Sequence, residues 1–187
     1  FAAASDGSGG VIVGGLTAGS LGGPNAGSVD VWLARYDGTG AQLWLRQFGT
    51  SADDRTGAAA SDGAGGCFVG GWTQGSLGGP SAGSNDAWLA RYDGAGNQLW
   101  IRQQGSASAD WSYAAAPGGT GGVYFGGATQ GSLGGPSAGL QDAWFGRYDG
   151  VVGTSYCTAG TSTNGCTPAL SATGTPSASA SSGFTLS

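Results

Sequence analysis

The sequence of residues 61–116 is SDGAGGCFVGGWTQGSLGGPSAGSNDAWLARYDGAGNQLWIRQQGSASADWSYAAA, and most of it recurs on both sides. Ser61-Asp62-Gly63 appears 56 residues earlier as Ser5-Asp6-Gly7, and Pro117-Gly118-Gly119 stands in the same place 56 residues later. No insertion breaks this register. A repeat of constant length predicts structural units of one kind, each stacked on its neighbours.

The repeat divides the chain into three units and a tail. The units are residues 1–56, 57–112 and an incomplete 113–150, and residues 151–187 are rich in Ser, Thr and Ala. Because Phe1 already lies inside a repeat, we expect the chain to be a piece of a longer protein. The tail resembles the start of a C-terminal module found on secreted bacterial proteins, and the alternative is a flexible, low-complexity linker.

Composition and turn signals predict an all-β chain. Lys, Glu and Met are absent, so the best helix-forming residues are scarce. In the second unit, four short apolar segments are separated by Gly-rich or Asp-Gly turns. These segments are 57–61, 67–72, 86–92 and 98–103. Each unit is therefore expected to form one four-stranded antiparallel sheet, with its alanine-rich strand innermost.

The third segment of each unit carries apolar side chains on both faces. In residues 31–36, which read VWLARY, the alternation expected of a sheet with one wet face is incomplete. Sheets stacked face to face around an axis, as the blades of a β-propeller are, meet this requirement. Closed propellers usually have about 4 to 8 blades. About three units therefore predict an incomplete or open β-propeller.

The repeat resembles a known bacterial family. Residues 86–93, which read DAWLARYD, are followed by Gly94, by Leu99-Trp100 and by a stretch like the GTSADD of residues 49–54. This pattern is similar to the bacterial β-propeller repeat called SBBP, and in strand order to NHL-type blades. The resemblance covers about residues 1–150 and implies a blade in a large secreted or cell-surface protein. It implies no catalytic residues.

The amino-acid composition also limits the catalytic groups that the chain can form. With no His, Lys or Glu, the usual nucleophile–base pairs cannot form. Asp53, Asp54 and Asp110 are candidates for the paired carboxylates of a glycosidase. Asp54 and Asp110 occupy equivalent repeat positions, however, which favours a role as turn caps or hydrogen-bond anchors. We predict that the chain is not an enzyme.

Partners and cofactors are limited by the same features. A net charge of −5 disfavours nucleic acid and anionic membranes, and no apolar run is long enough for a membrane span. We expect no cofactor. Calcium is the one candidate ion, because the Asp-Gly-x-Gly turns offer carboxylates, although they lack the alternating acidic ladder of a calcium loop.

Two groups of aromatic and charged residues stand out. Trp32, Trp88 and Trp144 recur at one strand position and are predicted to form the core between sheets, together with Trp44 and Trp100. Positions where the copies differ are better candidates for ligand binding. These positions hold Arg55, Trp111, Trp72 and Asp53.

The three cysteines predict two environments. Cys67 replaces valine in a strand and is expected to be a buried free thiol. Cys157 and Cys166 bracket a polar loop, for which a disulfide and an extracellular setting are the expectation.

These observations predict a non-enzymatic extracellular scaffold or protein-interaction module. The alternatives are a carbohydrate-binding propeller and a structural subunit of an extracellular assembly. The third unit lacks its fourth strand, which would leave the edge at residues 143–148 and the outer faces of the end units uncovered. We expect the tail, another copy of the chain or further blades to cover them.

Overall fold

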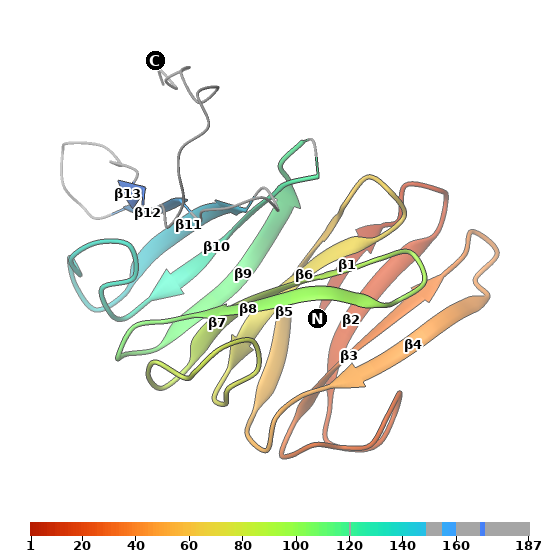
Figure 1. Ribbon diagram of the computed structural model, residues 1–187, viewed down its shortest axis with the longest axis horizontal. Coiled ribbons are helices and arrows are strands. Elements are labelled where there is room, and N and C mark those ends of the chain that lie inside the picture. The colour runs from red at the N-terminus through yellow and green to blue at the C-terminus, as the bar shows by residue number, and fades with distance from the viewer. Residues whose placement is uncertain (120, 149–154, 160–168, 171–187) are drawn as a thin grey trace.

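The structure is a computed structural model. It describes residues 1–119 and 121–148, together with the backbone of residues 155–159 and 169–170. All described elements are β-strands, which form three antiparallel sheets. The expected all-β fold is confirmed. The sheets stand side by side in chain order, from red and orange to teal and blue in Figure 1.

The strands follow one another in sequence order within each sheet. Sheet 1 contains β1 (Ala2–Ser5), β2 (Val11–Thr17), β3 (Asp30–Tyr36) and β4 (Gln42–Phe48). Sheet 2 contains β5 (Asp54–Ser61), β6 (Cys67–Thr73), β7 (Asp86–Tyr92) and β8 (Gln98–Gln104). Sheet 3 contains β9 (Asp110–Pro117), β10 (Val123–Thr129), β11 (Asp142–Tyr148), β12 (Ser155–Ala159) and β13 (Ala169–Leu170).

The tight turns form where Asp and Gly recur in the repeat. Between β7 and β8, the carboxylate of Asp93 accepts hydrogen bonds from the N–H groups of Ala95 (2.9 Å) and Asn97 (2.8 Å). Gly96 has a φ of +78°, which a residue with a Cβ rarely adopts. Asp37 holds the corresponding turn of sheet 1 in the same way. The turns that separate the strands are thus encoded locally.

The boundaries of the sheets differ slightly from those of the repeat units. β5 begins at Asp54 and β9 at Asp110, three residues before the units that start at 57 and 113. Phe1, from which the units are counted, corresponds to Gly57 and Tyr113, which lie within β5 and β9. The innermost strand therefore begins earlier than the repeat frame indicates.

The tail supplies the fourth strand of sheet 3. β12 pairs antiparallel with β11, from Ala143 opposite Ala159 to Arg147 opposite Ser155. Of the three ways in which the edge at residues 143–148 was expected to be covered, the structure shows the first. Cys157 lies in β12, whereas Cys166 lies outside the described residues, so the expected disulfide stays a prediction.

The three sheets approach one another most closely at their first strands. β5 lies against β1 on one side and against β9 on the other, and the main contacts between sheets all involve β5 or β9. These are the alanine-rich strands, whose small side chains allow a close approach. The sheets therefore spread apart from their inner strands toward their outer strands, as Figure 1 shows.

Each pair of neighbouring sheets buries one apolar face from each sheet. We call the face that a sheet turns toward the next sheet its forward face, and the opposite one its rear face. The forward face of sheet 1 and the rear face of sheet 2 form the first core, which contains Ile12, Val31, Leu33, Trp44, Cys67, Val69, Trp88, Ala90 and Tyr92. Sheets 2 and 3 form the second, which contains Ala60, Phe68, Ala87, Leu89, Val123, Phe125, Leu133 and Trp144.

The repeated tryptophans occupy these cores to different extents. Trp88 is 1% exposed and Trp144 2% exposed, and Trp44 is also buried. Trp32 differs from the expectation because it is only partly buried. It lies on the rear face of sheet 1, against which the described residues place no further sheet. Trp100, on β8, is partly buried and packs against the second core.

Cys67 is a free thiol with no exposed surface. Burial, and then the nearby carboxylate of Asp62, raise the pKa of this thiol to about 12. The side chain acts as a small apolar group in the first core, as its place among valines indicated.

Candidate functional site

The structure brings together three of the four residues that the differences between copies singled out. Arg55 on β5 lies directly opposite Trp72 on β6. Its guanidinium carbon is 5.0 Å from the centre of the Trp72 ring, and its Nη2 is 3.0 Å from Oδ2 of Asp53. Trp111 is the fourth residue and lies on β9, where its ring stacks on that of Tyr113 with centroids 6.4 Å apart. None of the described contacts joins it to the other three.

In the Arg55 cluster, the charges of Arg55 and Asp53 neutralise each other. The side chain of Ser28 and then Arg55 lower the pKa of Asp53, so the carboxylate is ionised beside the guanidinium. The guanidinium also covers one face of the Trp72 ring, the surface on which a sugar would stack. With side chains 40% and 22% exposed, Arg55 and Asp53 form a surface ion pair of small energetic weight.

The other carboxylates proposed for catalysis are buried anchors. Asp54 has no exposed surface, and its Oδ2 accepts hydrogen bonds from the backbone N–H (2.5 Å) and hydroxyl (2.9 Å) of Thr50. Its Oδ1 accepts one from the hydroxyl of Thr73. Asp110, equally buried, is held in the same way by Ser106. These groups tie the segment between two sheets to the start of the next inner strand, and no substrate can reach them.

A second set of buried aspartates anchors the long loops. Oδ2 of Asp30 accepts hydrogen bonds from the N–H of Ala26 (2.9 Å) and from the side-chain amide of Gln47 (2.8 Å). Asp86 repeats both contacts with Ala82 and Gln103 at 2.8 Å. The sequence indicated an anchoring role for the recurring aspartates. The glutamine partners were missed, although their own 56-residue recurrence was the available signal.

The turn carboxylates considered for calcium face their own backbone. Asp6 accepts hydrogen bonds from the N–H groups of Ser8 and Gly10, both at 2.8 Å, and Asp62 does the same with Ala64 and Gly66. Within the described part of the chain, no three acidic, His or Cys groups gather into a possible metal site. The geometry of these turns is explained by hydrogen bonding.

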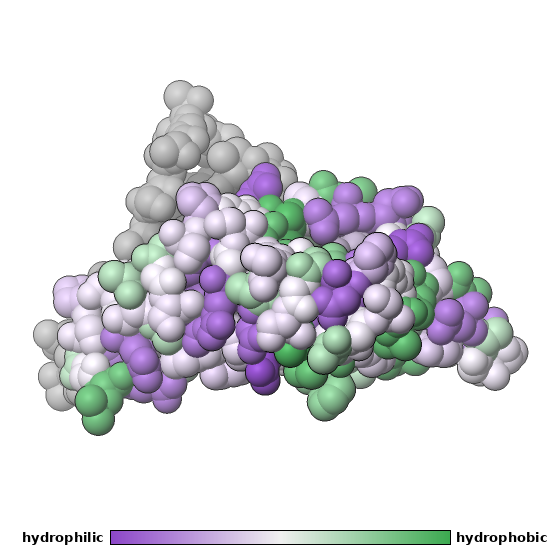
Figure 2. Space-filling view, turned by 90° about the horizontal axis from the view of Figure 1, so that it is seen from below, coloured by the Kyte–Doolittle hydropathy of each residue, from purple (hydrophilic) through white to green (hydrophobic). Residues whose placement is uncertain are grey.

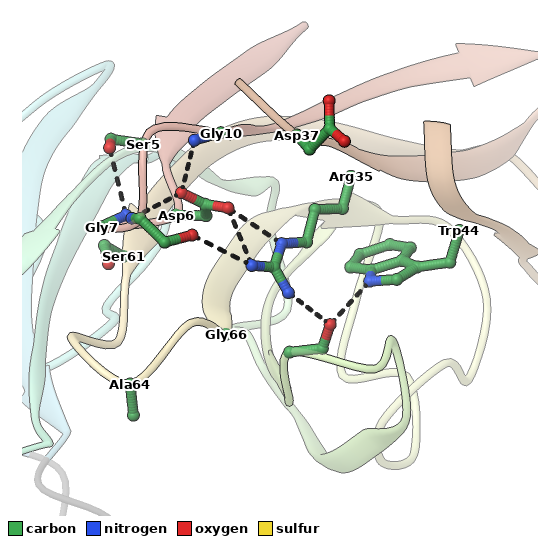
Figure 3. Close-up of polar contacts among 12 residues, drawn as sticks. Ser5, Asp6, Gly7, Gly10, Arg35, Asp37, Trp44, Ser61, Ala64 and Gly66 are labelled. Atoms are coloured by element: carbon green, nitrogen blue, oxygen red, sulfur yellow. Dashed lines mark hydrogen bonds and ion pairs between the residues drawn. The ribbon is translucent and has the colours of Figure 1, made fainter. Parts of the chain in front are cut away.

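Arg35 connects the Asp6 turn to the next sheet (Figure 3). Its guanidinium donates to Oδ2 of Asp6 from Nε (3.0 Å) and Nη2 (2.9 Å), and Nη1 donates to the carbonyl of Gly94 (2.7 Å). The indole N–H of Trp44 donates to the same carbonyl at 3.0 Å. Two side chains of sheet 1 thus hold the β7–β8 turn of sheet 2, which adds a polar clamp to the apolar contact.

The Asp6 clamp should make stability sensitive to acid. The N–H of Ser8, and then Arg35, lower the pKa of Asp6 despite its burial, from an ordinary value of 3.8. A lowered folded-state pKa contributes stability that is present above the ordinary value and is lost as the pH falls through the folded value. We therefore expect Asp6→Asn to be less stable than the wild type at neutral pH. The difference should shrink in acid, measured by denaturant unfolding across pH, and a constant difference would contradict this assignment.

Two surface hollows lie on the end faces, and neither is lined by the Arg55 cluster. One is on the forward face of sheet 3 and is lined by Tyr113, Ala114, Ala116, Tyr124 and Phe145, among others. The other is on the rear face of sheet 1 and is lined by Phe1, Ala3, Val13 and Trp32, among others. Both hollows lie on faces for which the count of repeat units predicts no neighbouring sheet.

The end faces expose side chains that the repeat buries elsewhere. Tyr124 and Phe145 are 38% and 51% exposed, whereas their counterparts Phe68 and Leu89 in sheet 2 are 0% and 2% exposed. Seen from below, the molecule carries its hydrophobic residues in several separate groups, with hydrophilic and weakly coloured residues between them (Figure 2). The apolar end faces are thus the best candidates for contact with a partner.

The sequence matches no protein-family model and no curated protein. The described residues form no helix with the length and apolar character needed to cross a membrane.

Proposed function

We propose that this chain is a non-enzymatic scaffold or protein-interaction module built from β-propeller blades. The observation that carries the proposal is the pair of apolar end faces that the described residues leave uncovered and that repeat the faces buried between sheets. The four-stranded antiparallel sheets, their small-residue inner strands and their spreading arrangement support the blade interpretation. The resemblance to SBBP repeats agrees with it.

An extracellular location is part of the proposal. It rests on the resemblance to secreted repeat proteins and on the expected disulfide between Cys157 and Cys166. The low content of charged residues and the abundance of Gly, Ser and Ala give little basis for binding nucleic acid. The proposed partner is therefore a protein that covers an apolar sheet face.

Carbohydrate binding is the second candidate function, and the Arg55 cluster is the observation that favours it. Arg55 on β5, Trp72 on β6 and Trp111 on β9 offer aromatic and hydrogen-bonding groups. However, the guanidinium of Arg55 already occupies one face of Trp72, and Trp111 stacks on Tyr113. The end faces, which no described side chain covers, support protein contact more strongly.

Site-specific photo-crosslinking separates these two functions. A photoreactive residue in place of Phe145 should crosslink to protein in extracellular material from the source organism, whereas one in place of Leu99 should not. Leu99 is a matched control because it is 50% exposed but lies on the outer strand β8. A glycan array run in parallel should show no binding. Glycan binding that Trp72→Ala abolishes, with no crosslink from position 145, would overturn the scaffold proposal.

A further inference from the structure

The two end faces of the chain are the two halves of an interface that the chain already forms twice. The forward face of sheet 1 packs on the rear face of sheet 2, and the forward face of sheet 2 packs on the rear face of sheet 3. Among the described residues, no sheet packs on the forward face of sheet 3 or on the rear face of sheet 1. Each of these two faces repeats one side of the interface between neighbouring sheets. The forward face of one copy is therefore complementary to the rear face of a second copy.

The rear face of sheet 1 keeps the side chains that its counterpart uses for docking. Val13, Trp32 and Tyr36 correspond to Val69, Trp88 and Tyr92, and each pair is identical in residue type. In sheet 2 these three side chains are buried by sheet 1, whereas in sheet 1 all three are partly exposed. The chain thus presents an almost unchanged copy of the surface that packs on the forward face of sheet 1.

The forward face of sheet 3 keeps the matching apolar character. Tyr124, Ala143 and Phe145 stand where sheet 2 has Phe68, Ala87 and Leu89, which are all buried by sheet 3. Each of the three positions remains apolar or aromatic, and the hollow between the inner strand and Phe145 is open. It offers space for the aromatic side chains that a rear face carries.

We propose that two copies of this chain associate head to tail and close a ring of six sheets. The forward face of sheet 3 of each copy would pack on the rear face of sheet 1 of the other, so the same interface forms twice. Three sheets that spread from their inner strands cannot close alone, whereas six lie within the range of about 4 to 8 blades of closed propellers. Once the first interface forms, the second is intramolecular, which strengthens closure. This inference rests on the proposed function and names its partner.

Sedimentation equilibrium of the 187-residue chain tests the ring. We expect twice the mass of one chain over a wide range of protein concentration, without further growth. Phe145→Asp and Val13→Asp each place a charge in both interfaces of the ring, so each should raise the dissociation constant by about 100-fold or more. Leu99→Asp, which changes an equally exposed side chain on an outer strand, should remain dimeric. Circular dichroism checks that every variant is folded.

Mixing the two variants tests the direction of the contact. In a head-to-tail pair, Phe145→Asp still has an intact rear face and Val13→Asp an intact forward face, so one native interface can form between them. The mixture should therefore associate more strongly than either variant alone. A contact between two identical faces predicts no such recovery and would overturn the proposal.

A measured mass other than that of two chains would contradict the proposal in one of several ways. A chain that stays monomeric at high concentration overturns the ring, whatever else covers its end faces, and growth beyond two copies overturns closure. If position 145 crosslinks only to a different protein and the chain is monomeric, the second-copy proposal fails while the scaffold function stands. If neither association nor a crosslink is found, both fail.

Discussion

Trp88→Ala should lower the free energy of unfolding by about 3–5 kcal/mol, the cost of removing a large aromatic side chain from a packed core. Trp88 is almost completely enclosed between sheets 1 and 2. Its ring meets that of Phe48 edge-on, with centroids 5.7 Å apart and planes at 80°. Its indole N–H donates to the carbonyl of Arg55 at 3.2 Å. Chemical denaturation monitored by circular dichroism measures the loss.

Trp32→Ala is the matched control, because Trp32 has the same repeat position in sheet 1, whose rear face no other described sheet covers. In a dilute, monomeric sample it should lose clearly less stability than Trp88→Ala. Equal losses of unfolding free energy would contradict the assignment of Trp88 to an interface between sheets. The deeper burial of Trp88 would then add nothing to its contribution to stability. A Trp88→Ala protein as stable as the wild type would contradict it outright.

Much of the fold follows from local signals that the sequence repeats. Segment 86–92 was expected as a strand and is β7, because an Asp-Gly turn ends it and the same turn recurs 56 residues earlier. The turn carboxylates of Asp93 and Asp37 hold backbone N–H groups within four residues, so no distant contact is needed. Features of this kind are predictable from one sequence.

Features that depend on a neighbouring element were harder to predict. Trp32 and Trp88 have the same sequence environment, yet only one is enclosed, because enclosure depends on whether another sheet packs there. β12 follows the end of the repeat, so no repeated pattern marked it as the strand beside β11. Pairing along an open edge depends on backbone hydrogen bonds, which many sequences can make.

The candidate ligand residues likewise have features that were predictable from the sequence and features that depend on neighbouring elements. Differences between copies pointed to Arg55, Trp72 and Asp53 one at a time, and the structure brings all three together. Their contacts with one another could not be predicted, because these contacts depend on the side-chain directions of two paired strands. The end faces were expected from the count of units. Their complementarity became visible only when the forward and rear residues could be assigned.

Asp54→Ala should be nearly as damaging as Trp88→Ala, with an expected loss of about 3–5 kcal/mol. The substitution removes a fully buried carboxylate and leaves the backbone N–H and hydroxyl of Thr50 and the hydroxyl of Thr73 without their acceptor. Hydrogen bonds to charged groups contribute about 1.5–3 kcal/mol each, and buried donors without an acceptor add a penalty. Asp54 also starts β5, whose first N–H donates to the carbonyl of Val29 at 2.8 Å. The loss should therefore loosen the connection between sheets 1 and 2.

The adjacent residue provides the control for this prediction. Asp53→Ala removes a carboxylate of the same chemical kind, one position away, but its partner Arg55 is 40% exposed. We expect that change to alter stability by no more than about 1 kcal/mol. Hydrogen exchange adds a second measurement, since Asp54→Ala should speed exchange in β5 and in the segment before it, while Asp53→Ala should not. Equal effects of the two substitutions would show that Asp54 is not an anchor, and the repeated aspartates would then need another explanation.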